Sequence, residues 1–160
     1  METSVRASLV EHLVCLLTQA QAHATFEEAT TGLPAGVWNQ PVPAVPYTIW
    51  QLAEHVRIAQ EDILDFSLDA RHRSPEWPAG YWPAPAATAD AATWQATLAQ
   101  IRADRQRFIG LLRNPATDLL APLPHGSGQT LLREALLVAD HTAYHTGEII
   151  LVRRLLRAWK

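Results

Sequence analysis

Apolar residues recur at intervals of three and four along four segments of the chain, and no segment shows sustained two-residue alternation. This pattern predicts four long α-helices and no β-strands. We expect the helices at about 4–30, 48–66, 89–113 and 130–159. Stretches rich in proline or glycine separate them, without an internal repeat or a flexible interdomain linker. Residues 1–160 are therefore predicted to form one all-α domain.

Several expected helix ends carry capping or termination signals. Thr48, with Gln51 three residues later, forms a capping-box pattern at the start of the second helix. Thr88 is a suitable N-cap for the third helix, and Asn114 followed by proline indicates its end. Gly32 is placed to end the first helix.

The last expected helix has three strips when it is projected at about 100° per residue. The strip expected in solvent contains Arg133, Asp140, Gly147 and Arg154. A second strip, expected to be buried, contains Leu132, Leu136, Ala139, Ala143 and Ile150. A third strip, away from the solvent strip, contains Glu134, His141, His145, Glu148 and Val152. Polar groups of this third strip must find partners inside the protein.

Two histidines of the third strip have the spacing of a metal-binding pair. His141 and His145 stand four residues apart, which brings their Cβ atoms to about 5–6 Å and lets both rings reach one divalent ion. The pair alone equally fits two half-buried histidines bonded to water or backbone. A metal site needs a third ligand, and His55, at the edge of the second helix's apolar stripe, is the best candidate. Asp62 and Glu148 are placed to orient such ligands.

Other metal-site patterns do not fit. A zinc protease motif requires H-E-x-x-H, and here Thr142, Ala143 and Tyr144 separate the two histidines. A di-iron site requires two Glu-x-x-His pairs, which the chain lacks. We expect structural or solvated roles for the remaining histidines, which are His12, His23, His72 and His125.

The connection between the second and third helices, about residues 70–88, is long and aromatic. It carries Trp77, Tyr81 and Trp82 among four prolines. Structureless connections beyond about 12–15 residues are uncommon and are often functional. Two interpretations remain open: a rigid lid over one end of the core, or a wall of a ligand pocket.

Composition excludes several classes of protein. The formal net charge is −3 and no basic run is present, so a nucleic acid is not expected as partner. No apolar run approaches the ~20 residues that cross a bilayer, and the N-terminus lacks a signal-peptide profile, so we expect a soluble cytoplasmic protein. Cys15 is the only cysteine, which excludes an intrachain disulfide and cysteine-rich zinc sites.

The two histidine-bearing segments together resemble the DinB-like superfamily. LLREALLVADHTAYHTGEIILVRRLLRAW is similar to the C-terminal helix of that family, whose pattern is close to D-H-x-x-Y-H-x-G-Q, and TIWQLAEHVRIAQEDILDF is similar to its first-ligand helix. The resemblance covers essentially the whole chain. It implies an antiparallel four-helix bundle with a long connection between helices 2 and 3, often a homodimer. It also implies nickel or zinc held by His55, His141 and His145. The sequence departs from the pattern at Glu148, where the family often has glutamine.

What the family does is implied less directly. Relatives include bacillithiol S-transferases and mycothiol-dependent isomerases, in which a metal binds the sulfur of a low-molecular-weight thiol and lowers its pKa. The resemblance therefore implies a metal-dependent thiol S-transferase or related detoxification and stress enzyme, acting on a small-molecule substrate. In it, Trp77, Tyr81 and Trp82 would wall the pocket, and Tyr144 would donate a hydrogen bond.

Two alternatives remain beside the transferase. The first is a metal-dependent hydrolase, in which the same site lowers the pKa of a bound water, although no carboxylate adjoins the histidine pair as a base. The second is a non-catalytic, stress-related metal-binding or dimeric scaffold protein. Histidines bonded to one another and to carboxylates in a closed, dry pocket would favour the scaffold.

Overall fold

A computed structural model describes residues 2–159 as a helical bundle. The four long helices are α1 (Glu2–Thr18), α3 (Ile49–Leu68), α4 (Ala91–Arg113) and α5 (Leu131–Leu155). A short helix, α2, spans Phe26–Thr30, and 3-10 turns lie at Ala35–Val37 and Ala79–Tyr81. The part of the chain that the structure describes contains no β-strand, so the predicted all-α class is confirmed. Within the same residues, no helix has the length and apolar character needed to span a membrane.

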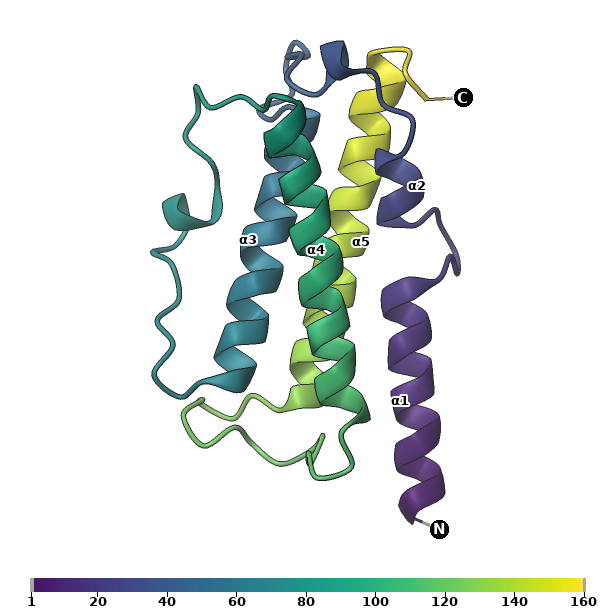
Figure 1. Ribbon diagram of the computed structural model, residues 1–160, viewed down its shortest axis with the longest axis vertical. Helices are drawn as coiled ribbons and strands as arrows, with labels where there is room; N and C mark the ends of the chain where they lie inside the picture. Colours follow the sequence, from purple (N-terminus) through teal and green to yellow (C-terminus); the bar gives the residue numbers. More distant parts are fainter. Residues whose placement is uncertain (1, 160) are drawn as a thin grey trace.

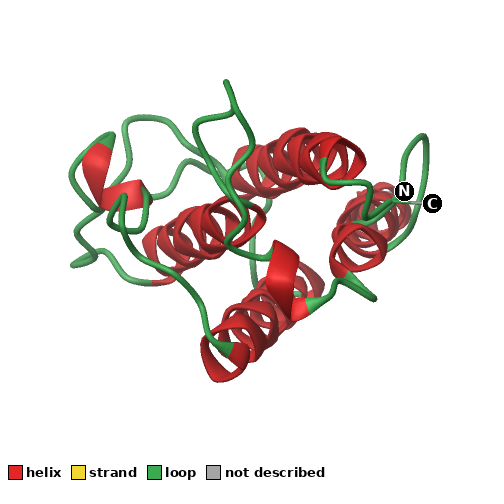
Figure 2. Cartoon of the chain, turned by 90° about the horizontal axis from the view of Figure 1, so that it is seen from above, coloured by secondary structure: helices red, strands yellow, loops and turns green. Residues whose placement is uncertain are grey.

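The helix directions follow from the colour gradient in Figure 1. α1 and α5 run one way along the bundle, and α3 and α4 run the other way. α3 packs against both α4 and α5. The connection formed by residues 69–90 runs along the outside of the bundle, from the end of α3 back to the level at which α3 began. α4 starts there, so the packed helices α3 and α4 are parallel. Figure 2 shows the long helices end-on, with the connections crossing above them.

The apolar core is divided along the bundle axis. One buried cluster contains Leu52 and Val56 of α3 with Ile149 of α5, and the other contains Leu64 of α3 and Phe108 of α4. Burying a side chain of this size stabilises the fold by about 1.5–3 kcal/mol. Between the two clusters the helices carry buried polar residues, which are Gln60, Asp104, His145 and Thr146. The buried polar residues therefore lie near the middle of the bundle, between the two apolar clusters.

The prediction of one helix over residues 4–30 is wrong. α1 ends at Thr18, and the chain becomes helical again only at Phe26. The Thr25 side chain accepts from the backbone N–H of Glu28, and Glu28 bonds back to the Thr25 backbone, so a capping box starts a new helix there. Of the leucines in α1, Leu13 and Leu17 are buried, whereas Leu16 is 47% exposed.

The other helix ends were predicted more closely. The capping box of Thr48 and Gln51 is confirmed. The third helix begins at Ala91, because Asp90 rather than Thr88 accepts a hydrogen bond from the N–H of Thr93. The last helix ends at Leu155 and not near 159, since Arg157 adopts a positive φ of 56°.

The strips of α5 were predicted in part. The four residues of the expected solvent strip are exposed. The strip expected to be buried is wrong, because Leu136 is 47% exposed and its other members are only partly covered. The best-covered face contains Glu134, His145 and Val152 of the third strip instead. Which face of α5 is buried depends on how α5 packs against α3, and helical periodicity alone does not determine that packing.

Candidate metal centre

Three histidines converge between α3 and α5. One ring nitrogen from each of His55, His141 and His145 lies within 4.8 Å of the others, an arrangement able to hold a metal ion. The Nε2 atoms of His141 and His55 are 3.0 Å apart, and the ring of His145 is 4.4 Å from that of His141 between centroids. His55 and His145 are buried, whereas His141 is partly exposed. Helical spacing alone positions the α5 pair, while packing of α3 against α5 brings in His55.

Two of the rings are oriented through their Nδ1 atoms. His55 Nδ1 lies 2.7 Å from the backbone oxygen of Tyr81, which can only accept, so Nδ1 donates and Nε2 keeps its lone pair. His145 Nδ1 lies 2.6 Å from a carboxylate oxygen of Glu148 and donates in the same way to the ionised group. Such outer hydrogen bonds are typical of metal-bound histidines. Both Nε2 atoms are therefore available as ligand atoms.

The environment keeps the histidines neutral at pH 7. Burial, followed by the nearby His145 and His55, lowers the pKa of His141 from its ordinary 6.5 to about 4. Burial and His55 likewise lower the pKa of His145 to about 4. Burial also lowers the pKa of His55, against the opposing effects of the Tyr81 carbonyl and Glu148. Neutral imidazole is the form that binds metals, so all three rings are ready to coordinate.

The long connection covers one side of the cluster. Trp82 stacks on His55 with ring centroids 3.8 Å apart and an interplanar angle of 3°. Tyr47 stacks on Trp82 at 3.7 Å, and two rings that close to one indole must lie on opposite faces of it. Gln51 of α3 donates to the backbone oxygen of Pro85 and holds the same connection in place. The stack excludes water from one face of His55.

A second set of polar contacts ties the connection to α3. The hydroxyl of Tyr81 donates to Asp62 at 2.6 Å, and His72 pairs with the other oxygen of Asp62 at 2.7 Å. Burial, followed by the hydrogen bond and charge of Asp62, raises the pKa of Tyr81 to about 12. Tyr81 therefore stays protonated as a donor, and its backbone oxygen is held where His55 needs it.

The residues predicted around the metal take different positions. Glu148 contacts His145 directly, and burial raises its pKa, against the opposing effects of His55 and a hydrogen bond with Tyr144. The exposed ring of Tyr144 lies 4.9 Å from that of His145. Among the described residues, Asp62 bonds to Tyr81 and His72 and to none of the three clustered histidines, so its link to the cluster runs through Tyr81. Trp77 is 74% exposed and packs edge-on against Tyr81, so the structure does not place it beside the histidines.

Sequence reasoning did not identify Tyr47. It lies in the proline-rich segment before α3 and reaches the site only through Trp82. The available signal was the aromatic residue directly before the Thr48 cap, because the start of α3 lies less than two turns from His55. The four remaining histidines keep the predicted structural or solvated roles. For example, His125 bonds to the backbone oxygen of Phe66, and His12 is exposed.

The donor set fits one divalent cation of the zinc or nickel type. Imidazole nitrogens suit both ions, and three protein ligands leave coordination positions for water or substrate. A separation of 3.0 Å between two Nε2 atoms is compatible with two ligands of one ion, and also with a direct hydrogen bond between the rings. A metal measurement on the protein distinguishes these two states.

Comparison with known proteins agrees with the geometry. The family model of the DinB superfamily matches residues 18–149, a range that includes all three histidines and most of the bundle. No curated protein and no solved structure matches the chain. The extent of the family match shows that this chain belongs to the DinB superfamily.

Proposed function

We propose that His55, His141 and His145 bind one divalent ion, nickel or zinc, and that the protein is a metal-dependent thiol S-transferase. The observation that carries the proposal is the convergence of three neutral imidazoles, two of them with Nδ1 already bonded to the protein. When bound, the metal would lower the pKa of a coordinated thiol and supply thiolate at neutral pH. The sulfur would then form a bond to an electrophilic carbon as the leaving group departs, and the thiol proton would pass to solvent.

The surrounding side chains have separate tasks in this proposal. Glu148 holds His145 in the orientation that presents Nε2. Trp82 shields His55 from water on one face. His141 and Tyr144 lie on the more open side, so thiol and substrate would enter there. The proposal includes a small-molecule substrate, a cytoplasmic location and a homodimer.

Hydrolysis is less well supported by the same contacts. A hydrolase needs a general base beside the metal-bound water. Glu148 is the carboxylate that contacts the cluster, and it is already bonded to His145. The scaffold alternative draws support from the short contact between His55 and His141, which matches histidines bonded to each other. A metal measurement distinguishes a metal-free scaffold from the transferase and the hydrolase, which both need the ion. Activity assays then distinguish all three, because the two enzymes catalyse different reactions and the scaffold catalyses none.

The first experiment measures bound metal by elemental mass spectrometry on protein purified without a histidine tag. We expect about one divalent ion per chain in the wild type and a large loss in both His55→Ala and His141→Ala. His12→Ala is the matched control, since His12 is exposed and lies outside the cluster. No bound metal after incubation with nickel or zinc would contradict the metal site.

The second experiment tests turnover on the metal-loaded protein. A panel of low-molecular-weight thiols is combined with chlorinated and epoxide electrophiles, and thioether formation is followed by mass spectrometry. We expect conjugation that chelation abolishes and metal restores. A protein that binds one metal ion but accelerates no thiol reaction would refute the transferase while leaving the metal centre intact. Chelator-sensitive hydrolysis of simple esters would favour the hydrolase instead.

A further inference from the structure

The outward face of α5 is largely apolar and remains exposed. The helix packs with its other faces against α1, α2 and α3. Four large side chains that project within about 100° of one another on the outward face are 47–65% exposed, namely Leu136, Tyr144, Leu151 and Leu155. They extend over about 28 Å of the helix. Single exposed leucines need no explanation, but a contiguous apolar face of this length indicates an interaction site.

The apolar face of α5 continues onto the end of α1. Leu16 of α1, which is about half exposed, lines a pocket together with Ala139 and Ala143 at one edge of the face, and Arg105 of α4 lies deeper in the same pocket's wall. Helical periodicity predicted burial for Leu136, Ala139 and Ala143, yet the chain itself covers them only in part. A partner that packs on this face would supply the burial that the sequence pattern indicates.

The charges on the face indicate that the partner is a second copy of this chain. Asp140 and Arg154 each stand seven residues from Gly147, on opposite sides of it, which is about two helical turns. No ion pair within residues 2–159 involves either of them. If two α5 helices lie antiparallel with a two-fold axis at Gly147, Asp140 of each copy meets Arg154 of the other. The face is therefore complementary to itself in charge.

The charges also select this register over a neighbouring one. A two-fold axis about one turn nearer the start of α5, midway between Arg133 and Arg154, would bring Arg133 of one copy to Arg154 of the other. Two like charges would then meet twice in a partly dry interface, which is unfavourable. With the axis at Gly147, Arg133 has no opposite residue and keeps its own pairing with Glu134.

The side chains next to the axis also fit an antiparallel pair. Gly147 has no side chain, and a Cβ placed there would meet no atom within 4 Å apart from the adjoining helix backbone, so the two helices can approach closely. Tyr144 and Leu151 project to the same side of Gly147, and the two-fold axis places Leu151 of one copy beside Tyr144 of the other. We propose that two copies of the chain associate through antiparallel α5 helices centred on Gly147, with two symmetric Asp140–Arg154 pairs.

This interface would lie beside the metal centre without covering it. The inference rests on the homodimer included in the proposed function, and not on metal binding or thiol transfer. His141 projects about 120° around α5 from Gly147, so the second copy would leave it accessible. Tyr144, whose ring is 4.9 Å from that of His145, would be covered by Leu151 of the second copy. Each copy would thus form one border of the other's entrance beside His141.

The first test measures the dimer dissociation constant of the full-length protein by sedimentation velocity over a range of concentrations. We expect a dimer in the wild type. Gly147→Glu should weaken it by at least about 100-fold, because two carboxylates and their bulk would meet at the two-fold axis. Gly110→Glu is the matched control, since Gly110 is an exposed helical glycine of α4 with equally open surroundings, and it should leave the dissociation constant unchanged.

A charge exchange tests the register and keeps the experiment decisive if Gly147→Glu fails to fold. Asp140→Arg alone would bring two arginines together at each end of the interface, and we expect at least about tenfold weaker association. Adding Arg154→Asp in the same chain exchanges the charges of each pair and should restore the dissociation constant to within about threefold. Circular dichroism confirms that each variant is folded.

The outcomes separate this inference from the rest of the proposed function. A wild type that stays monomeric at every concentration tested would overturn both the interface and the homodimer, whereas metal content, measured on the same samples, reports on the histidine cluster independently. A dimer that persists in Gly147→Glu, that weakens equally in Gly110→Glu, or that the charge exchange does not restore would overturn the α5 interface alone.

Discussion

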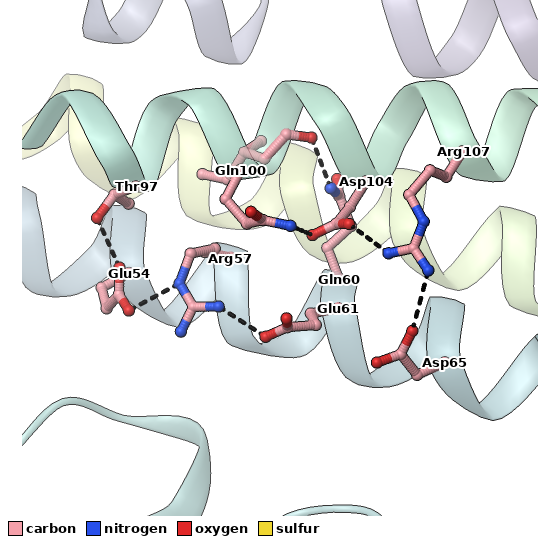
Figure 3. Close-up of polar contacts among 10 residues, drawn as sticks. Glu54, Arg57, Gln60, Glu61, Asp65, Thr97, Gln100, Asp104 and Arg107 are labelled. Atoms are coloured by element: carbon pink, nitrogen blue, oxygen red, sulfur yellow. Dashed lines mark hydrogen bonds and ion pairs between the residues drawn. The ribbon is translucent and has the colours of Figure 1, made fainter. Parts of the chain in front are cut away.

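Two polar clusters contact α3, and they differ in how their charges are balanced. The cluster facing α4 alternates carboxylates with arginines, as Figure 3 shows. The cluster facing α5 gathers three histidines and has no arginine or lysine among its hydrogen-bond partners within residues 2–159. Both bring polar groups into a partly dry interior, which is unfavourable unless partners are present. The comparison shows which kind of cluster supports the fold and which is available for a ligand.

In the α3–α4 cluster, donors and acceptors bond to one another. Arg57 donates to Glu54 and to Glu61, each at 2.7 Å, and Glu54 also accepts from Thr97 (Figure 3). Burial alone would lower the pKa of Arg57, but the two glutamates outweigh it and raise the pKa. The protein thereby favours the charged form, and the acceptors are used by its own donors. Such a network stabilises the interface without requiring a ligand.

In the histidine cluster, by contrast, some acceptor lone pairs have no donor within the cluster. The pKa values of His141 and His145 are lowered to about 4, so the protein favours neutral rings whose lone pairs face one another. One hydrogen bond between two rings can use only one of these lone pairs. A cation would use all of them. The difference between the clusters is therefore a difference between satisfied charges and unused lone pairs.

The largest effect should come from removing a histidine. His141→Ala leaves two imidazoles, and we expect metal affinity to fall by at least about 100-fold, because a third of the protein ligands is lost. Competition titration with a chromophoric chelator measures the affinity. Glu54→Gln in the α3–α4 cluster is the contrasting variant and should leave metal affinity within about twofold. A comparable loss in both variants would remove the distinction between the clusters.

The next effect is on stability and concerns Asp104. This carboxylate is fully buried and accepts from Gln100 and Arg107, each at 2.8 Å. Asp104→Ala would remove the buried acceptor of Gln100, while Arg107 would keep Asp65 and solvent as partners, and we expect the free energy of unfolding to fall by about 1–3 kcal/mol. Urea titration gives the value. Metal stoichiometry should stay at that of the wild type, and its loss would show that the clusters are coupled.

A smaller effect is expected from pH on the metal-free protein. The pKa values of His141 and His145 are about 4 in the folded chain and about 6.5 when unfolded, so the unfolded chain binds more protons between these limits. The free energy of unfolding should therefore decrease as the pH falls from about 6.5 to about 4. We expect a loss of about 1 kcal/mol, because solvent screens the partly exposed His141.

Urea titrations of the metal-free protein at several pH values between 4 and 7 measure this dependence. The double variant His141→Asn with His145→Asn is the control and should flatten it, since it removes both titrating rings. A slope that survives in the double variant would mean that other groups are responsible.

The smallest effect should follow Glu61→Gln. The Glu61 side chain is 42% exposed and pairs with Arg57 at a spacing of four residues. Such surface pairs contribute about 0.3–0.5 kcal/mol. Chemical denaturation at low and high salt should show a loss of that size that disappears at about 1 M salt, where charges are screened. A loss above about 1 kcal/mol would mean that Glu61 is an essential part of the α3–α4 cluster.

Local patterns predicted local features well. The capping box at Thr48 depends on residues three positions apart and was identified correctly. The prediction failed where two local tendencies competed. Between residues 19 and 25 the apolar period continued through small alanines, but the capping box at Thr25 started a separate helix. The pocket that Arg105 lines could not be predicted, because it forms only where that break meets α3, α4 and α5.

By itself, the sequence determined the helical class, most helix ends and the pairing of His141 with His145, since all of these depend on residues within a few positions of one another. The tertiary structure decided which third group joins that pair. His55 lies 86 residues before His141, and only packing of α3 against α5 brings their Nε2 atoms to 3.0 Å. The tertiary structure also decided which nitrogen of His55 carries the proton and which face of its ring is shielded from water. The groups responsible, the Tyr81 carbonyl and the Trp82 ring, come from a connection without helical periodicity. Long-range contacts of this kind depend on the shape of the whole bundle, which a local pattern does not contain.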